Sequence, residues 1–167
     1  SNNIEVDCIV TQNALKMINL KKLKENIKGK IYTNKSERNN KMLHIQLTRK
    51  SDLIALCPAT ANIIAKFANG FADDLASTTL IASDKKIVII PAMNSEMWNN
   101  PINKKNVSII LKAGIEFIGP EYGYLSCGEV GLGRLSNPKK INKSLLEYLN
   151  NTQIFKNKDC LITAGPT

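Results

Sequence analysis

An uninterrupted apolar run at residues 87–90 (IVII) constrains the fold more than any other stretch of this sequence. A strand with one solvated face alternates polar and apolar residues, whereas a continuous β-branched run requires both of its faces to be covered. Other strand-like runs lie at residues 6–11, 52–56 and 116–118. Segments with helical spacing separate these runs, at residues 61–68, 75–82, 106–113 and 141–149. The alternation predicts an α/β fold, in which helices cover both faces of a parallel sheet.

Two segments carry weaker patterns. Residues 19–42 are rich in Lys and Asn, and we expect a surface connection with little regular structure. Residues 125–134 (LSCGEVGLGR) hold three glycines, one cysteine and one arginine, and they predict a flexible loop that covers a bound substrate.

Composition narrows the class of protein. The chain has 167 residues, 43% of them hydrophobic, which is enough for one domain with a substantial core. The formal net charge is +9. The lysines are scattered and few aromatic residues interleave with them, whereas a nucleic-acid interface gathers its basic residues on one face. We therefore expect no nucleic-acid partner, and the positive charge suits an anionic, phosphorylated substrate.

The four cysteines form no CxxC pair, so we expect no metal site. Cys8, Cys57 and Cys160 lie in apolar runs, where cysteine behaves as a small hydrophobic residue. Cys127 differs because glycines and polar residues surround it. No secretory signal and no apolar run long enough to span a bilayer is visible, so we expect a cytoplasmic protein without a membrane partner.

Polar or small residues follow three of the predicted strands. They are Thr11, residues 58–60 (PAT) and residues 91–94 (PAMN). Ligands of parallel α/β sheets bind at the carboxyl ends of the strands, so these residues are candidates for a binding site. Thr60 is also a plausible plain helix cap, which would need no ligand.

Three single residues are candidates for chemistry, each with an ordinary structural alternative. His44 is the only histidine; it can act as a base or hydrogen-bond donor, or serve as a surface residue. Asn94 can bind a carboxylate without bringing a charge, or cap the turn that follows the strand. Cys127 can donate a proton or act as a nucleophile, or be an inert thiol.

Four stretches taken together resemble one family. HIQL at 44–47, the run from 51 to 75, PAMNSEMWNNP at 91–101 and GYLSCGEVGLGRL at 123–135 are similar to the flavoprotein cysteine decarboxylases. Within that family they most resemble the enzymes that act on phosphopantothenoylcysteine in coenzyme A biosynthesis. The resemblance implies a Rossmann-like, flavodoxin-like domain that binds FMN at the contacts of a homotrimer. Fused bacterial members of the family assemble further, into dodecamers.

The resemblance also implies roles for individual residues. His44 and Cys127 match active-site residues, and Asn94 matches the amide that binds the substrate carboxylate. Met97 is expected beside Asn94 in the substrate site. The positions that match FMN contacts are Thr11, Gln12, Asn13, Thr60, Ala61, Asn62, Ile63 and Ala92.

The implied reaction converts 4′-phosphopantothenoylcysteine to 4′-phosphopantetheine. Flavin oxidises the substrate thiol to a thioaldehyde, CO2 leaves, and the ene-thiol is reduced again. In this scheme His44 assists oxidation and decarboxylation, Asn94 orients the carboxylate, and Cys127 supplies a proton in the last step.

The domain prediction follows from both ends of the chain. We expect an FMN-binding decarboxylase domain at 1–150 that lacks the family's N-terminal strand and its phosphate-binding loop. A linker is expected at 151–158. Residues 159–167, which contain ITAGPT, resemble the first strand of a phosphopantothenoylcysteine synthetase domain.

Other functions stay open at this point. A peptidyl-cysteine decarboxylase shares most of these motifs, and a non-catalytic, phosphatase-regulating relative shares the fold. A flavin prenyltransferase fits less well, because His44, Asn94 and Cys127 occur together. A basic binding module would need no flavin at all.

Overall fold

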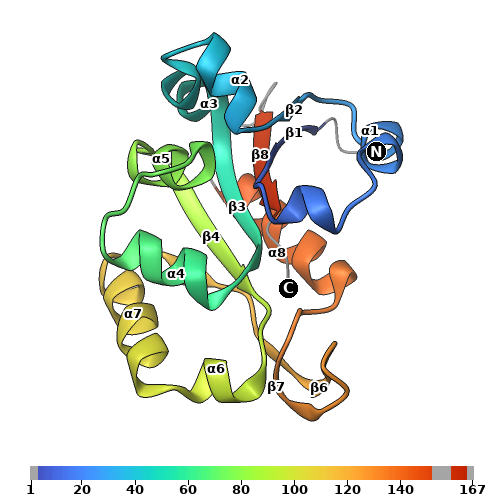
Figure 1. Cartoon of the computed structure of the whole chain (residues 1–167), viewed down its shortest axis with the longest axis vertical. Helices are drawn as coiled ribbons and strands as arrows, with labels where there is room; N and C mark the ends of the chain where they lie inside the picture. The colour runs from blue at the N-terminus through green and yellow to red at the C-terminus, as the bar shows by residue number, and fades with distance from the viewer. Residues whose placement is uncertain (1–3, 152–158, 165–167) are drawn as a thin grey trace.

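The computed structural model describes residues 4–151 and 159–164, and one parallel sheet organises them (Figure 1). Its strand order is β2-β1-β8-β3-β4-β5. The strands are β1 Glu5–Val10, β2 Ile31–Tyr32, β3 Ser51–Ala59, β4 Lys86–Pro91, β5 Glu116–Phe117 and β8 Asp159–Ala164. A separate antiparallel hairpin is formed by β6 Glu121–Tyr124 and β7 Val130–Arg134.

The helices connect these strands. They are the 3-10 helix η1 Ala14–Lys16, α1 Leu20–Asn26, α2 Asn34–Asn39, α3 Leu43–Lys50, α4 Ala61–Ala68, α5 Leu75–Ile81, α6 Ser95–Asn99, α7 Pro101–Lys112 and α8 Pro138–Asn151. Side chains of α3, α4, α5 and α7 pack on one face of the sheet, and those of α8 pack on the other. The prediction of a parallel sheet with helices on both faces is confirmed.

The central strands are buried on both sides, as the apolar run predicted. In β4, Ile87 and Ile89 join the core under α3, α4, α5 and α7, while Val88 and Ile90 join the core under α8. β3 alternates in the same way along residues 53–56. Because neither face is open to a ligand, only the ends of the strands can form a site.

The order in which the chain adds strands reverses between β1 and β3. From β1 the chain moves outward to the edge strand β2, and from β3 it moves outward in the opposite direction through β4 to β5. Thr11 follows β1 and Thr60 follows β3, so these two residues lie on either side of the reversal. Ligands of open α/β sheets bind at such a point, beyond the carboxyl ends of the strands.

β8 lies at the same reversal. It pairs in parallel with β1 from Glu5 to Val10 and with β3 from Ser51 to Leu56. The assignment of 159–167 to a further domain stays a prediction, as does the 1–150 boundary. The predicted linker falls almost entirely on residues 152–158, outside the described part of the chain.

Two expectations from the sequence are wrong. Residues 19–42 are not irregular, because local caps support short helices there. Asn19 accepts a hydrogen bond from the Lys22 N–H at the start of α1, and Thr33 forms a capping box with Ser36 at the start of α2. The glycine-rich segment at 125–134 is not one free loop, because its second half, residues 130–134, forms strand β7 and pairs with β6; residues 125–129 are the turn of the hairpin.

We predict that Ile89→Ala lowers the free energy of unfolding by roughly 2–5 kcal/mol, because the deletion leaves a cavity in the centre of the sheet. Ile89 is fully buried. Ile102→Ala is the matched control, since Ile102 is 68% exposed, and a change within about 0.5 kcal/mol is expected there. Denaturant titration measures both values. Equal, small losses would contradict the burial of Ile89 in the core under α3, α4, α5 and α7.

Candidate functional site

A pocket of about 360 Å3 opens at the carboxyl edge of β3 and β4. Its lining includes five of the residues that the sequence singled out: Thr60, Ala92, Asn94, Met97 and Cys127. The remaining wall comes from the hairpin and the residues beside it, among them Tyr124 and Arg134. The volume is that of a small-molecule site. The hairpin therefore lies beside the strand ends, and its role in covering a bound substrate stays a prediction.

The Asn94 side chain both caps a helix and faces the pocket. Its Oδ1 accepts hydrogen bonds from the N–H groups of Glu96 at 2.7 Å and Met97 at 3.4 Å, at the start of α6. This capping fixes the orientation of the amide, so that Nδ2 points toward the hairpin. The capping role and the binding role, which the sequence left as alternatives, are thus compatible.

Cys127, Asn94 and Glu129 form one polar cluster. The Asn94 Nδ2 lies 2.8 Å from Glu129 Oε2 and 3.6 Å from the Cys127 sulfur. The Cys127 sulfur in turn lies 3.5 Å from the same Glu129 oxygen. A carboxylate and a thiol are therefore both within reach of an amide whose direction is fixed.

Sequence reasoning missed Glu129 and Tyr124. The spacing of Glu129, two residues after Cys127 at the tip of a hairpin, was the available signal. Tyr124, at the end of β6, lines the pocket although it is 79% exposed.

Two glycines let the hairpin lie directly against the strand-end segment. The Met93 N–H donates to the Gly133 carbonyl at 2.9 Å. A β-carbon on Gly133 would collide with the Met93 carbonyl oxygen, and one on Gly131 would collide with the Ser95 hydroxyl. Larger residues at either position would push the hairpin away from Asn94.

The start of α4 supplies the second part of the site. Thr60 is the N-cap residue, but its side chain makes no capping hydrogen bond. The first N–H groups of a helix, here those of Ala61, Asn62 and Ile63, have no partner within the helix and can bind polar or anionic groups. Ile63 offers only its backbone, since its side chain is buried in the core.

Thr11, Gln12 and Asn13 lie at the same edge of the sheet, after β1. Thr11 Oγ1 accepts a hydrogen bond from the Ala14 N–H at 3.3 Å, and Gln12 and Asn13 are exposed. These three residues do not line the pocket beside Asn94. They flank the strand reversal from the side opposite Thr60.

His44 does not join the other candidates. It is on α3, and its Nδ1 lies 2.6 Å from Glu37 Oε1 on α2. In Figure 1, α2 and α3 lie at the top of the molecule, whereas α6 and the hairpin lie at the bottom. The structure therefore separates His44 from the pocket of its own chain.

The inner cysteines contrast with Cys127. Burial raises the pKa of the Cys57 thiol to about 11, and burial together with the Asp7 carboxylate raises that of Cys8 to about 11. Both thiols stay protonated near neutral pH and are poor nucleophiles. Cys127 is exposed.

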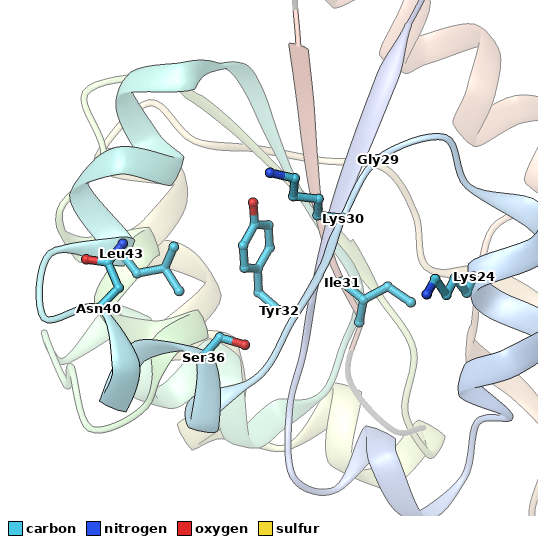
Figure 2. Close-up of a pocket in the computed structure, with 8 residues that line it drawn as sticks. All are labelled: Lys24, Gly29, Lys30, Ile31, Tyr32, Ser36, Asn40 and Leu43. Carbon is cyan, nitrogen blue, oxygen red and sulfur yellow. The ribbon is translucent and has the colours of Figure 1, made fainter.

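A larger hollow of about 600 Å3 lies along the edge strand β2 (Figure 2). In the figure Lys30 and Tyr32 project toward the side on which Leu43 and Asn40 lie, and Ile31 projects to the other side. None of the residues predicted for the site lines this hollow. Its size alone assigns no function to it.

The part of the chain that the structure describes offers neither a metal cluster nor a membrane-spanning helix. Among these residues no group of three or more His, Cys, Asp or Glu side chains is arranged to hold a metal ion. None of the described helices is both long and apolar enough to cross a membrane.

The fold and the pocket define a class of protein, namely Rossmann-like α/β proteins with a pocket beyond the carboxyl ends of their parallel strands. The sequence profile of the family named Flavoprotein matches residues 1–150. The chain therefore belongs to the Flavoprotein family.

Two relatives are named coenzyme A biosynthesis bifunctional protein CoaBC. The chain is 38% identical to that of Bacillus subtilis (strain 168) over 166 residues, which cover 97% of this chain and 41% of the relative. It is 40% identical to that of Borreliella burgdorferi over 164 residues, covering 98% of this chain and 42% of the relative. The chain thus spans about two fifths of the length of these relatives.

Two solved structures share the fold. One is a mutant PPC decarboxylase complexed with pantothenoylaminoethenethiol, with a TM-score of 0.80 and 24% identity over 90% of this chain and 100% of that one. The other is the FMN binding protein AtHal3, with a TM-score of 0.78 and 25% identity over 89% of this chain and 97% of that one.

We predict that Gly133→Ala loosens the hairpin, because the added methyl group collides with the Met93 carbonyl. Cleavage by a protease within residues 121–134 should speed up roughly fivefold or more, as expected when about 1 kcal/mol of closing free energy is lost. Val130→Ala is the control, since Val130 is exposed on the same strand. Equal cleavage rates in the two variants would show that Gly133 does not hold the hairpin in place.

Proposed function

We propose that this protein catalyses the FMN-dependent decarboxylation of 4′-phosphopantothenoylcysteine to 4′-phosphopantetheine in coenzyme A biosynthesis. One observation carries the proposal. The Asn94 amide, held in direction by its helix cap, faces the exposed Cys127 thiol in a pocket at the carboxyl edge of the sheet. The curated relatives named for coenzyme A biosynthesis support the choice of pathway.

The described residues fit an FMN group. Ala92 and Thr60 leave room for a flat ring at the pocket wall, and the N–H groups at the start of α4 suit its polar edge. Thr11, Gln12 and Asn13 would hold FMN from the other side of the strand reversal. When bound, FMN supplies the oxidation of the substrate thiol and the later reduction.

Asn94 and Met97 would bind the substrate at its reacting end. The Asn94 amide donates to the substrate carboxylate without introducing a charge, which holds the carboxylate in place but leaves CO2 free to depart. Met97 lines the same pocket and offers an apolar contact. Arg134, at the hairpin end of the pocket, is a cation suited to an anionic substrate.

Cys127 would donate a proton after CO2 has left. Its sulfur is exposed on the hairpin and hydrogen-bonded to groups of the pocket. The hairpin would exclude water at this step, as lids over active sites commonly do.

His44 would act in the pocket of another copy of the chain. One chain cannot bring α3 to the hairpin, because the two lie at opposite ends of the molecule (Figure 1). A cyclic oligomer would place the His44 of one copy beside the Asn94 of the next. The oligomer that we propose is a homotrimer, with a dodecamer as the larger assembly. Glu37 would fix the orientation of the imidazole ring through its 2.6 Å contact.

Free cysteines agree with the cytoplasmic location that we propose for this enzyme.

The testing experiment measures CO2 release from 4′-phosphopantothenoylcysteine, with and without FMN, in the parent protein and in Cys127→Ser. We expect FMN-dependent release in both proteins, but 4′-phosphopantetheine from the parent only, because the variant lacks the last proton donor. Full turnover by the variant would remove Cys127 from the mechanism. No release by folded, flavin-loaded parent protein would contradict the proposed substrate, and a peptide ending in cysteine would be tested next.

Mixing two inactive variants tests whether the site is shared between copies. His44→Asn and Asn94→Asp should each abolish CO2 release, the second because its carboxylate repels that of the substrate. After the subunits exchange, about a quarter of the sites in a cyclic oligomer combine an intact His44 with an intact Asn94. We therefore expect CO2 release to recover to about a quarter of the parent rate. No recovery despite mixed oligomers would place both residues in one chain or remove His44 from the site.

A further inference from the structure

Glu129 lies within the proposed site, and its carboxylate has no part in the reaction described above. Its Oε2 accepts a hydrogen bond from Asn94 Nδ2 at 2.8 Å and lies 3.5 Å from the Cys127 sulfur. The hairpin tip positions the residue through its backbone, since the Leu125 N–H donates to the Glu129 carbonyl at 2.8 Å. The Glu129 carboxylate is thus hydrogen-bonded to the Asn94 amide, which is the group proposed to bind the substrate carboxylate.

The Asn94 amide cannot serve both carboxylates at full strength. Its Oδ1 accepts hydrogen bonds in the cap of α6 and can only accept, so every hydrogen bond to a carboxylate must come from the two hydrogens on Nδ2. The same Nδ2 lies 2.8 Å from the Glu129 carboxylate and 3.6 Å from the Cys127 sulfur, so both of these groups already stand at the donor side of the amide. A second carboxylate at this amide would also be repelled by the first, because like charges a few ångströms apart are unfavourable.

We propose that Glu129 is an internal competitor, a carboxylate that holds the Asn94 amide until the substrate carboxylate displaces it. This inference rests on the proposed role of Asn94. The same contact ties the tip of the hairpin to the start of α6 while the pocket is empty of substrate. Glu129 therefore sets the affinity of the site for carboxylates and acts as a specificity-determining residue, since a substrate without a carboxylate does not displace it.

The charge of Glu129 beside Cys127 can be tested without flavin or substrate. Iodoacetate is an anion and iodoacetamide is neutral, and the two alkylate the same sulfur. The alkylation of Cys127 by each reagent is followed by peptide mass. The rate with iodoacetate divided by the rate with iodoacetamide is low when a negative charge lies next to the thiol. In Glu129→Gln this ratio should rise about threefold to tenfold, as expected when one nearby charge is removed. A purely structural effect on exposure would change both rates alike.

Glu121→Gln is the matched control. Glu121 belongs to the same hairpin, but its carboxylate contacts Lys140 at 3.0 Å rather than Asn94. The alkylation ratio should stay at the parent value in this variant. An unchanged ratio in Glu129→Gln, or an equal rise in both variants, would overturn the placement of Glu129 at Cys127.

Steady-state kinetics of the FMN-loaded enzyme then test the competition itself. In Glu129→Gln the KM for 4′-phosphopantothenoylcysteine should fall about threefold to tenfold, because the neutral amide binds Asn94 more weakly than a carboxylate does. A raised KM would show that Glu129 assists binding and would overturn the proposal. If the parent releases no CO2, the proposed substrate fails, while the alkylation ratio still decides the position of Glu129.

Discussion

Burial of β3 and β4 on both faces is the constraint on which the site depends. Residues 87–90 contribute alternately to two separate cores, so helices must cover both sides of the sheet. A ligand can then approach only at the strand ends. The segments that follow β3 and β4 meet at this edge, and they bring Thr60, Ala92 and Asn94 to one pocket. The chemistry of the site is therefore placed by packing far from the reacting groups.

Within the pocket, the arrangement of the polar groups depends mainly on the direction of the Asn94 amide. Asn94 follows β4 and is the N-cap residue of α6. Its side-chain oxygen accepts hydrogen bonds from two backbone N–H groups. With its oxygen accepting from both N–H groups, the Asn94 amide presents its Nδ2 donor to the hairpin. The arrangement is an example of a helix cap that prepares a binding group, which is why structural and functional explanations of Asn94 need not compete.

The sequence predicted well those elements that are formed by burial of apolar residues. It predicted poorly those elements that are supported by local hydrogen bonds. The apolar runs predicted the parallel sheet because an uninterrupted run has few alternatives. The helices in residues 19–42 were missed because polar caps such as Asn19, rather than an apolar stripe, support them. Asn94 and Cys127 were predicted to belong to one site for two reasons. They match a known family, and ligands of parallel sheets bind at the carboxyl ends of the strands. The separation of His44 from them, and the contact of Glu129, depend on three-dimensional positions that no spacing along the chain encodes.

The inner face of the hairpin consists of glycines, and this has a thermodynamic consequence. Gly131 and Gly133 face the strand-end segment, whereas Tyr122, Val130 and Leu132 are exposed even when the hairpin is closed. Lifting the hairpin would break main-chain and polar contacts but uncover little apolar surface. Exposure of apolar surface is what makes heat capacity change in protein transitions. The opening of this lid should therefore have a heat-capacity change near zero, and its equilibrium should follow a straight van't Hoff line over temperatures at which the folding equilibrium of the whole domain is strongly curved.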